Sequence, residues 1–180
     1  MIWKAIGLVA LAVVLGLLMA TGSRANDEDK LYLVDVHCRR DIELDAAKKL
    51  APSLIATRDG GGILKGSDAL GRPVISVPAE KLTVLHESKA VRAVHTDVPK
   101  DWQPVRRLKL SYGPHTKPDD AELTNLGLRL VEDYQKGRFM VVEPKNGQID
   151  AELTLKLEHC PKIEYIAPLF RTKAIQPHHP

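Results

Sequence analysis

The two cysteines of this chain each follow a histidine, in His37-Cys38 and His159-Cys160. Thiolates and imidazoles are ligands that tetrahedral zinc prefers, so these four side chains first suggest a metal site. Neighbouring residues of a strand point to opposite faces of a sheet, however, so His37 and Cys38 cannot easily share one ion. We therefore expect no metal site.

Cys38 and Cys160 could instead form a disulfide, if the chain folds in an oxidising compartment. The bond would join the two halves of the chain and close a long loop. In the chain-entropy model, closing such a loop contributes about 4 kcal/mol to the free energy of unfolding. Two separate free thiols are the alternative, and the sequence leaves both open.

No segment carries a recognisable catalytic or cofactor-binding motif. Gly60-Gly61-Gly62 lacks the Lys-Ser/Thr of a phosphate-binding loop, and neither G-x-G-x-x-G nor H-E-x-x-H occurs. Ser67 lies in Gly-Ser-Asp-Ala-Leu-Gly, which is not a nucleophile elbow. We predict no catalytic residue and no cofactor, although a triad assembled only in space would leave no trace in sequence order.

Composition narrows the class of protein further. The chain has 180 residues, 44% of them hydrophobic, and 26 Lys and Arg against 23 Asp and Glu. This allows one ordinary domain or two very small ones, and it excludes a disordered chain and a disulfide scaffold. A net charge of +3 with two Trp, four Tyr and two Phe also disfavours a nucleic-acid-binding protein.

The first 25 residues form a targeting segment. Residues 5–23 are uncharged and mostly apolar, Lys4 precedes them, and Arg24 and an acidic stretch follow. This pattern is typical of a signal peptide or of a single membrane anchor, which would be the protein's one contact with a membrane. In both cases the rest of the chain lies outside the cytoplasm, in the periplasm or the extracellular space. Its net charge then falls to about +1, which favours no partner by charge.

The remaining sequence predicts the same succession of elements twice. In the first half we expect strands at 31–36, 73–77 and 91–95, a helix over 41–51 that Pro52 ends, and a helix from Pro78. In the second half we expect strands at 105–112, 139–142 and 163–166, with helices from Pro118 to Gly137 and over 150–159. Leu85, Val91 and Val94 precede Leu157, Ile163 and Ile166 by a constant spacing, which indicates a repeat.

This order predicts an α+β fold of two ferredoxin-like (split β-α-β) units after the N-terminal hydrophobic helix. Each antiparallel sheet would carry its helices on one face. The units would span 26–98 and 105–170, with a linker at 99–104 and a tail at 171–180. Residues 54–65 could supply the fourth strand of the first unit, whereas the second lacks an obvious one. A single α/β domain without duplication is the alternative.

Residues 75–97 resemble the second half of the subtilisin propeptide and subtilisin-inhibitor family. The matching positions are a strand, a helix start with Pro and Glu, two leucines, and a closing Val-x-x-Val strand before an acidic residue: Val77, Pro78, Glu80, Leu82, Leu85, Val91, Val94 and Asp97. The second half repeats this more loosely with Leu153, Leu157, Pro161, Ile163 and Ile166. Ser88-Lys89 departs from the family, which usually has Asp-Pro there.

The resemblance implies a module that docks its open sheet face on a subtilisin-like serine protease, acting in trans because no protease domain follows. Its C-terminal tail, here with Phe170, Arg171, Thr172, Lys173 and Ala174, would lie extended in the substrate groove; a frayed terminus is the alternative. Trp102 either packs the linker or anchors a partner. The other function that we consider is a non-catalytic envelope protein with a structural or interaction role and no protease partner.

Overall fold

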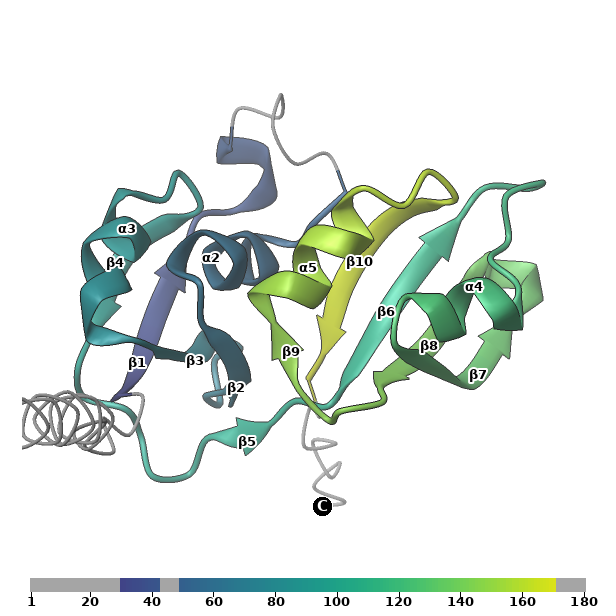
Figure 1. Cartoon of the computed structure of the whole chain (residues 1–180). Helices are drawn as coiled ribbons and strands as arrows, with labels where there is room; N and C mark the ends of the chain where they lie inside the picture. Colours follow the sequence, from purple (N-terminus) through teal and green to yellow (C-terminus); the bar gives the residue numbers. More distant parts are fainter. Residues whose placement is uncertain (1–29, 43–48, 171–180) are drawn as a thin grey trace, which may run out of the picture.

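The computed structural model describes residues 30–42 and 49–170 as two antiparallel sheets side by side, with helices packed on them (Figure 1). The α+β class and the antiparallel sheets expected from the sequence are confirmed. The expected hydrophobic helix at 5–23 lies outside the described residues. None of the helices within the described ranges has the length and hydrophobicity needed to cross a bilayer.

The first sheet, sheet A, has the strand order β4-β1-β3-β2-β5. Its strands are β1 (Lys30–Val36), β2 (Ile63–Ser67), β3 (Pro73–Val77), β4 (Val91–His95) and the short β5 (Gln103–Pro104). The short strand β9 (Ile149–Asp150), from the second half of the chain, also pairs with β2. Strands β3 and β4 confirm the sequence prediction, and β5 falls in the expected linker.

The second sheet, sheet B, follows the same path through the second half of the chain. Its order is β10-β6-β8-β7, with β6 (Arg107–Tyr112), β7 (Leu128–Tyr134), β8 (Phe139–Pro144) and β10 (Ile163–Leu169). In both sheets, therefore, the first and third strands of the half lie in the centre, and the second and fourth lie on either side of them.

Four α-helices lie in front of the sheets in the view of Figure 1. They are α2 (Pro52–Gly60), α3 (Leu82–Glu87), α4 (Asp120–Asn125) and α5 (Ala151–Glu158), and η1 (Arg39–Asp41), η2 (Ala79–Lys81) and η3 (Gln135–Gly137) are 3₁₀ turns. Local sequence fixes several ends. Asp119 and Glu122 form a reciprocal capping box at α4, and Asp150 accepts a hydrogen bond from the Leu153 amide at α5.

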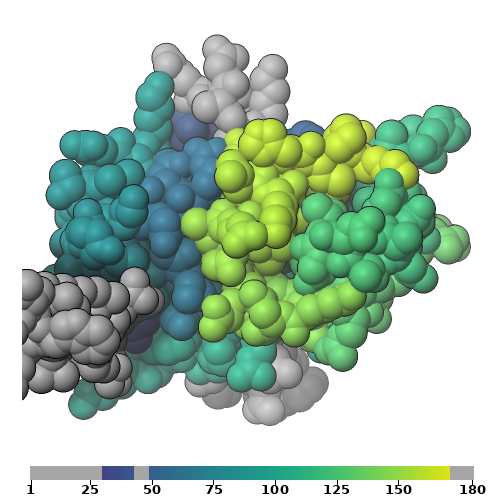
Figure 2. Space-filling model, viewed as in Figure 1, coloured from purple at the N-terminus to yellow at the C-terminus, as the bar shows by residue number. Residues whose placement is uncertain are grey.

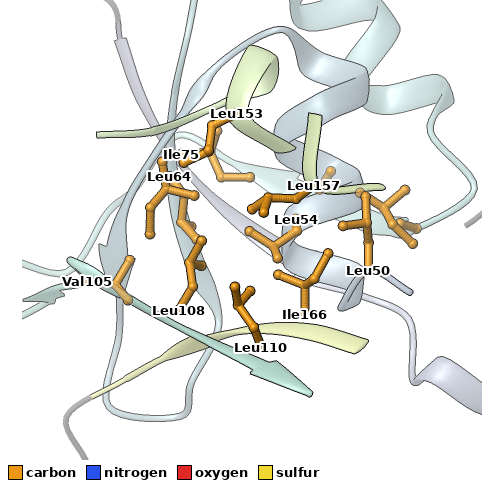
Figure 3. Packing of buried hydrophobic residues seen from close by; sticks show 14 of the residues in the cluster. Leu50, Leu54, Leu64, Ile75, Val105, Leu108, Leu110, Leu153, Leu157 and Ile166 are labelled. Atoms are coloured by element: carbon orange, nitrogen blue, oxygen red, sulfur yellow. The ribbon is translucent and has the colours of Figure 1, made fainter. Parts of the chain in front are cut away.

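Helices α2 and α5 join the two halves into one core. They lie side by side in the centre of the molecule, and their colours meet without a break in Figure 2. Leu54 of α2 and Leu157 of α5 point into the same cluster as Leu110 and Ile166 of sheet B (Figure 3). One hydrophobic core therefore extends through both halves of the chain.

Each half also adds a short segment to the other half's sheet. Leu50 forms a parallel bridge with Ile166 on β10, supported by backbone hydrogen bonds of 2.7 and 2.8 Å. In return, β9 pairs with β2. These pairings satisfy backbone groups at two sheet edges that would otherwise be open to another strand.

Pro52 begins a helix rather than ending one, which corrects the sequence prediction. Ala51 is extended and serves as the N-cap, and Pro52 is in the first turn of α2, where its missing N–H costs nothing. The helix then runs through residues expected as strand and loop, and it ends where Gly61 takes a left-handed conformation, φ 62°. The extra strand of this half is β2, at the end of the expected 54–65 stretch.

A second correction concerns the helix expected from Pro118 to Gly137. Gly127 has φ 75°, a backbone conformation that glycine adopts without strain, and the chain turns there after the short helix α4. Leu130 and Val131, expected on a helix, belong to β7. This strand is the one that the second half lacked in the sequence prediction. The apolar spacing that predicted a helix there comes from a short helix followed by a strand, in which neighbouring side chains point to opposite faces.

Candidate functional site

The outer face of sheet B is the side that points away from the helices. Leu108, Leu110 and Met140 belong to the core, so the residues that alternate with them point outward. With the strand registers, this assigns to the outer face Arg107, Lys109, Ser111, Arg129, Glu132, Tyr134, Phe139, Val141, Glu143, Tyr165, Ala167 and Leu169. Arg129 is strongly exposed, at 71% of its side chain.

Aromatic rings lie at the β7 side of this face. Tyr134 and Phe139 stack with centroids 4.5 Å apart, and Lys109 Nζ lies 4.3 Å from the Phe139 centroid. Both groups contact the Phe139 ring, which makes it less available for stacking by a nucleic-acid base. Tyr134 is 45% exposed, and its hydroxyl donates to Glu132. An exposed tyrosine beside charged groups is typical of a protein interface.

Paired charges lie next to the rings. Arg107 Nε donates to Glu143 at 2.8 Å, and Arg129 Nη2 donates to the other oxygen of the same carboxylate. Hydrogen bonds from Arg107 and then from Arg129 hold the pKa of Glu143 below its ordinary value. Because one carboxylate holds both guanidinium groups in place, the pattern of charge on this face is fixed before any partner binds.

A hollow of about 490 Å³ opens at the end of the face, between β5 and the end of β10. Its lining consists of Gln103, Pro104, Arg106, Arg107, Glu143, Leu169 and Phe170. Phe170 is partly buried against the core and is the last residue described, so the C-terminal tail leaves the fold beside this hollow. Arg171, Thr172, Lys173 and Ala174 lie outside the described residues.

The first half of the chain contributes one side chain to the β10 side of this face. The guanidinium carbon of Arg39, in η1, lies 4.3 Å from the centroid of the Tyr165 ring. This is the geometry of a cation–π contact. The outer face of sheet B is therefore a composite of both halves.

The outer face of sheet A differs. Leu33 and Val74, paired across β1 and β3, point away from the helices, yet they are only 3% and 0% exposed. Trp102 packs on β2, where a Cβ at Gly66 would lie 2.5 Å from the tryptophan ring. Trp102 itself is half-buried. The centre of this face therefore carries buried apolar side chains, whereas the centre of the sheet B face carries Lys109 beside Phe139.

An ion cluster lies on the same outer face of sheet A, towards β4. Asp35 on β1 contacts His95 on β4 at 3.0 Å and Arg72 at 3.4 Å. The hydrogen bond from His95, followed by the charges of His95 and Arg72, lowers the pKa of Asp35. Arg72 is also held by Asp68, whose side chain is 4% exposed and accepts backbone hydrogen bonds from Leu70 and Arg72 in the β2–β3 turn. These contacts explain the cluster as structural.

The cysteines are free thiols in this structure, Cys38 exposed and Cys160 partly buried. The disulfide between them stays a prediction. His159 Nδ1 contacts the Leu155 carbonyl at 2.8 Å, one turn back on α5. Within residues 30–42 and 49–170, no group of three or more His, Cys, Asp or Glu side chains could hold a metal ion.

Sequence reasoning missed the most exposed parts of the site. Tyr134 was hidden because its strand was expected to be a helix. Alternation along Phe139–Pro144 does carry a signal, since Phe139, Val141 and Glu143 share one face. Nothing in the sequence indicates that Arg107 and Arg129, on different strands, meet at Glu143.

Comparison of the chain with family models, with curated proteins and with solved structures found no match. The function must therefore be inferred from the residues and the fold.

Proposed function

We propose that this protein is an exported protein-binding module that inhibits or chaperones a subtilisin-like serine protease in trans. One observation carries the proposal. The exposed outer face of sheet B, with its tyrosine and arginines, lies on the same sheet whose last strand, β10, leads into the C-terminal tail. A partner bound on that face would have the tail beside it, with ten further residues available, 171–180.

We further infer that each half is a ferredoxin-like unit. Apart from the short β9, which pairs with the other sheet, both halves have the order strand, helix, strand, strand, helix, strand. Both sheets place these strands in the order fourth, first, third, second. That element order is the split β-α-β arrangement. It supports the family resemblance of residues 75–97, because the strand–helix–strand stretch quoted there corresponds to β3, α3 and β4.

The docking unit in this proposal is the second one. Its outer face offers Tyr134 at 45% exposure, Arg107 at 47% and Arg129 at 71%. Tyrosine and arginine are the side chains that most often dominate the binding energy of protein interfaces. On the equivalent face of sheet A, Leu33 and Val74 are buried instead of exposed, so the first unit is the supporting one in this proposal.

The tail would act as a substrate-like strand. An extended peptide can pair its backbone with an edge strand of an enzyme, and its side chains then enter the specificity pockets. The residues assigned to this role are Phe170, Arg171, Thr172, Lys173 and Ala174. The proposal requires that residues 1–25 direct export, since an exported subtilisin-like protease meets this protein only if the protein is exported too. Mass spectrometry of the native N-terminus tests this, and a chain that begins at Met1 and stays in the cytoplasm would contradict it.

Inhibition assays test the function directly. The purified protein is titrated against a panel of subtilisin-like proteases with a chromogenic peptide substrate. We expect inhibition of at least one member at micromolar concentration or below, and no cleavage of the folded domain. A variant without residues 171–180 should inhibit much more weakly while keeping its thermal stability. If no protease in the panel is inhibited beyond ordinary substrate competition, the proposal is wrong, and a pull-down partner that is not a protease would favour the interaction-protein alternative.

A further inference from the structure

The charges around the outer face of sheet B are unequal in sign. Arg107, Lys109 and Arg129 lie on the face, and exposed Arg106 lines the adjoining hollow. The opposing carboxylates are Glu143, which Arg107 and Arg129 share, and Glu132, which accepts a hydrogen bond from Tyr134. These six side chains, counted without Arg39 over Tyr165, therefore sum to a net charge of +2, whereas all of residues 26–180 sum to only about +1.

Positive charge continues into the tail, where Arg171 and Lys173 follow Phe170 in the sequence. Such a local excess attracts a surface of opposite sign and steers its approach. The rings on the face do not favour a polyanion of nucleic acid, because Phe139 already contacts Tyr134 and Lys109. The face combines a small aromatic centre with fixed cations, which fits a folded protein surface.

We propose that the outer face of sheet B, together with the hollow at its end, binds an acidic protein surface, one that presents carboxylates around an apolar patch. This rests on the proposed function and names the chemistry of the partner at the same site. Among subtilisin-like proteases, it selects those whose docking surface carries excess Asp and Glu. Lys109 and Arg129 are then residues that determine which partner is accepted.

The test uses subtilisin with its active-site serine blocked by phenylmethylsulfonyl fluoride, in native form and after succinylation, which converts lysines to carboxylates. Blocking the active site separates docking on the face from tail insertion. At an ionic strength of about 0.01 M we expect the purified protein to associate about tenfold faster with the succinylated form, and we expect this preference to disappear near 1 M, where the Debye length falls to about 3 Å.

Matched variants assign the effect to the face. Lys109→Gln/Arg129→Gln removes two cations and leaves Arg107 on Glu143, so no carboxylate is left unpaired. It should abolish the preference, whereas Lys89→Gln/Arg92→Gln, which removes two exposed cations at β4 of sheet A, should preserve it. Equal association of the two subtilisin forms, or equal loss with Lys89→Gln/Arg92→Gln, would overturn the inference. So would a dimer in solution that Lys109→Gln/Arg129→Gln dissociates, because the occupant would then be a second copy.

Protease inhibition tests the proposed function, and salt-dependent association through Lys109 and Arg129 tests the acidic-surface inference. Inhibition of a protease with association rates independent of salt would leave the proposed function standing and overturn the acidic-surface inference. Binding of succinylated subtilisin through Lys109 and Arg129, without inhibition of any protease in the panel, would support the inference and remove the inhibitor function. Tighter binding of single-stranded oligonucleotides than of succinylated subtilisin, lost in the double variant, would assign the face to nucleic acid and overturn the inference.

Discussion

The outer faces of the two sheets differ, although the two sheets have the same strand order. On sheet A, Leu33 and Val74 are paired and both buried. On sheet B, Val141 is also buried, but its partner Lys109 is partly exposed and lies over Phe139. Trp102 lies against sheet A, and Arg129 projects from sheet B with 71% of its side chain exposed. The comparison teaches that one frame can supply a face for packing and a face for binding, depending on which side chains alternate outward.

On the helix side of the sheets, in contrast, the two halves of the chain contact each other through α2 and α5. Arg58 of α2 forms an ion pair with Glu158 of α5, in which Nη1 donates to both carboxylate oxygens at 2.7 and 2.8 Å. Hydrogen bonds to Glu158 and Asp59 raise the pKa of Arg58 although burial opposes this. Asp59 also accepts a hydrogen bond from Ser88, which follows α3. The two halves therefore differ in their outer faces and are joined through their helices.

The largest expected effect tests the joined side. Leu54→Ala removes a fully buried side chain from α2 and should lower the free energy of unfolding by about 2–5 kcal/mol, because the cavity cannot fill completely. Both halves should unfold in one transition, measured by far-UV circular dichroism and by tyrosine fluorescence. Leu155→Ala on α5, 47% exposed, is the control and should change stability by less than about 0.5 kcal/mol. Two separate transitions would show that the halves fold independently.

The outward faces are compared directly by Leu33→Ala and Tyr134→Ala. Leu33 is 3% exposed, so its truncation should cost about 2–4 kcal/mol of stability and leave inhibition of the protease unchanged once the protein is folded. Tyr134 is 45% exposed, so its truncation should change stability little and weaken inhibition about tenfold or more. Chemical denaturation and inhibition constants check the two results. An unchanged inhibition constant for Tyr134→Ala would reject sheet B as the docking face.

A smaller effect is expected where Trp102 covers sheet A. The added methyl of Gly66→Ala would lie 2.1 Å from the Gln103 carbonyl oxygen and 2.5 Å from the Trp102 ring, so β5 and the ring must move. We expect a loss of about 1–3 kcal/mol and a red shift of Trp102 fluorescence. Measurement in a Trp3→Phe background leaves Trp102 as the single fluorescent indole. Sheet B should keep its binding activity, and a parallel loss of inhibition would mean that the two faces are coupled.

The smallest expected effect is a pH dependence of sheet B. The pKa of Glu143 is lowered in the folded protein, so its ion pairs contribute stability above the unfolded pKa and lose it as pH falls through the folded value. Thermal unfolding should therefore show a loss below about pH 4 that is smaller in Glu143→Gln. Because Arg107 and Arg129 are 47% and 71% exposed, salt should reduce the difference. If both proteins lose the same stability at acid pH, the ion pairs of Glu143 do not contribute to the pH dependence.

Strands with strong alternation or β-branched residues were predictable from local sequence. Residues 73–77 and 91–95 are strands as expected, and α5 occupies most of the predicted 150–159 helix. Errors arose at Pro52, because proline can either end a helix or begin one, and at Gly127, because glycine can lie within a helix or in a turn after it. The packing of the neighbouring segments decides which of these occurs.

The sequence by itself determined the α+β class and the limited charge of the chain, because these follow from periodicity and composition. Tertiary structure alone decided that α2 and α5 share one core, that Leu50 pairs with Ile166, and that Arg107, Arg129 and Glu143 meet on one face. The physical reason is strand pairing. Neighbours across a sheet come from segments far apart in the chain, and local sequence does not encode which strands become neighbours.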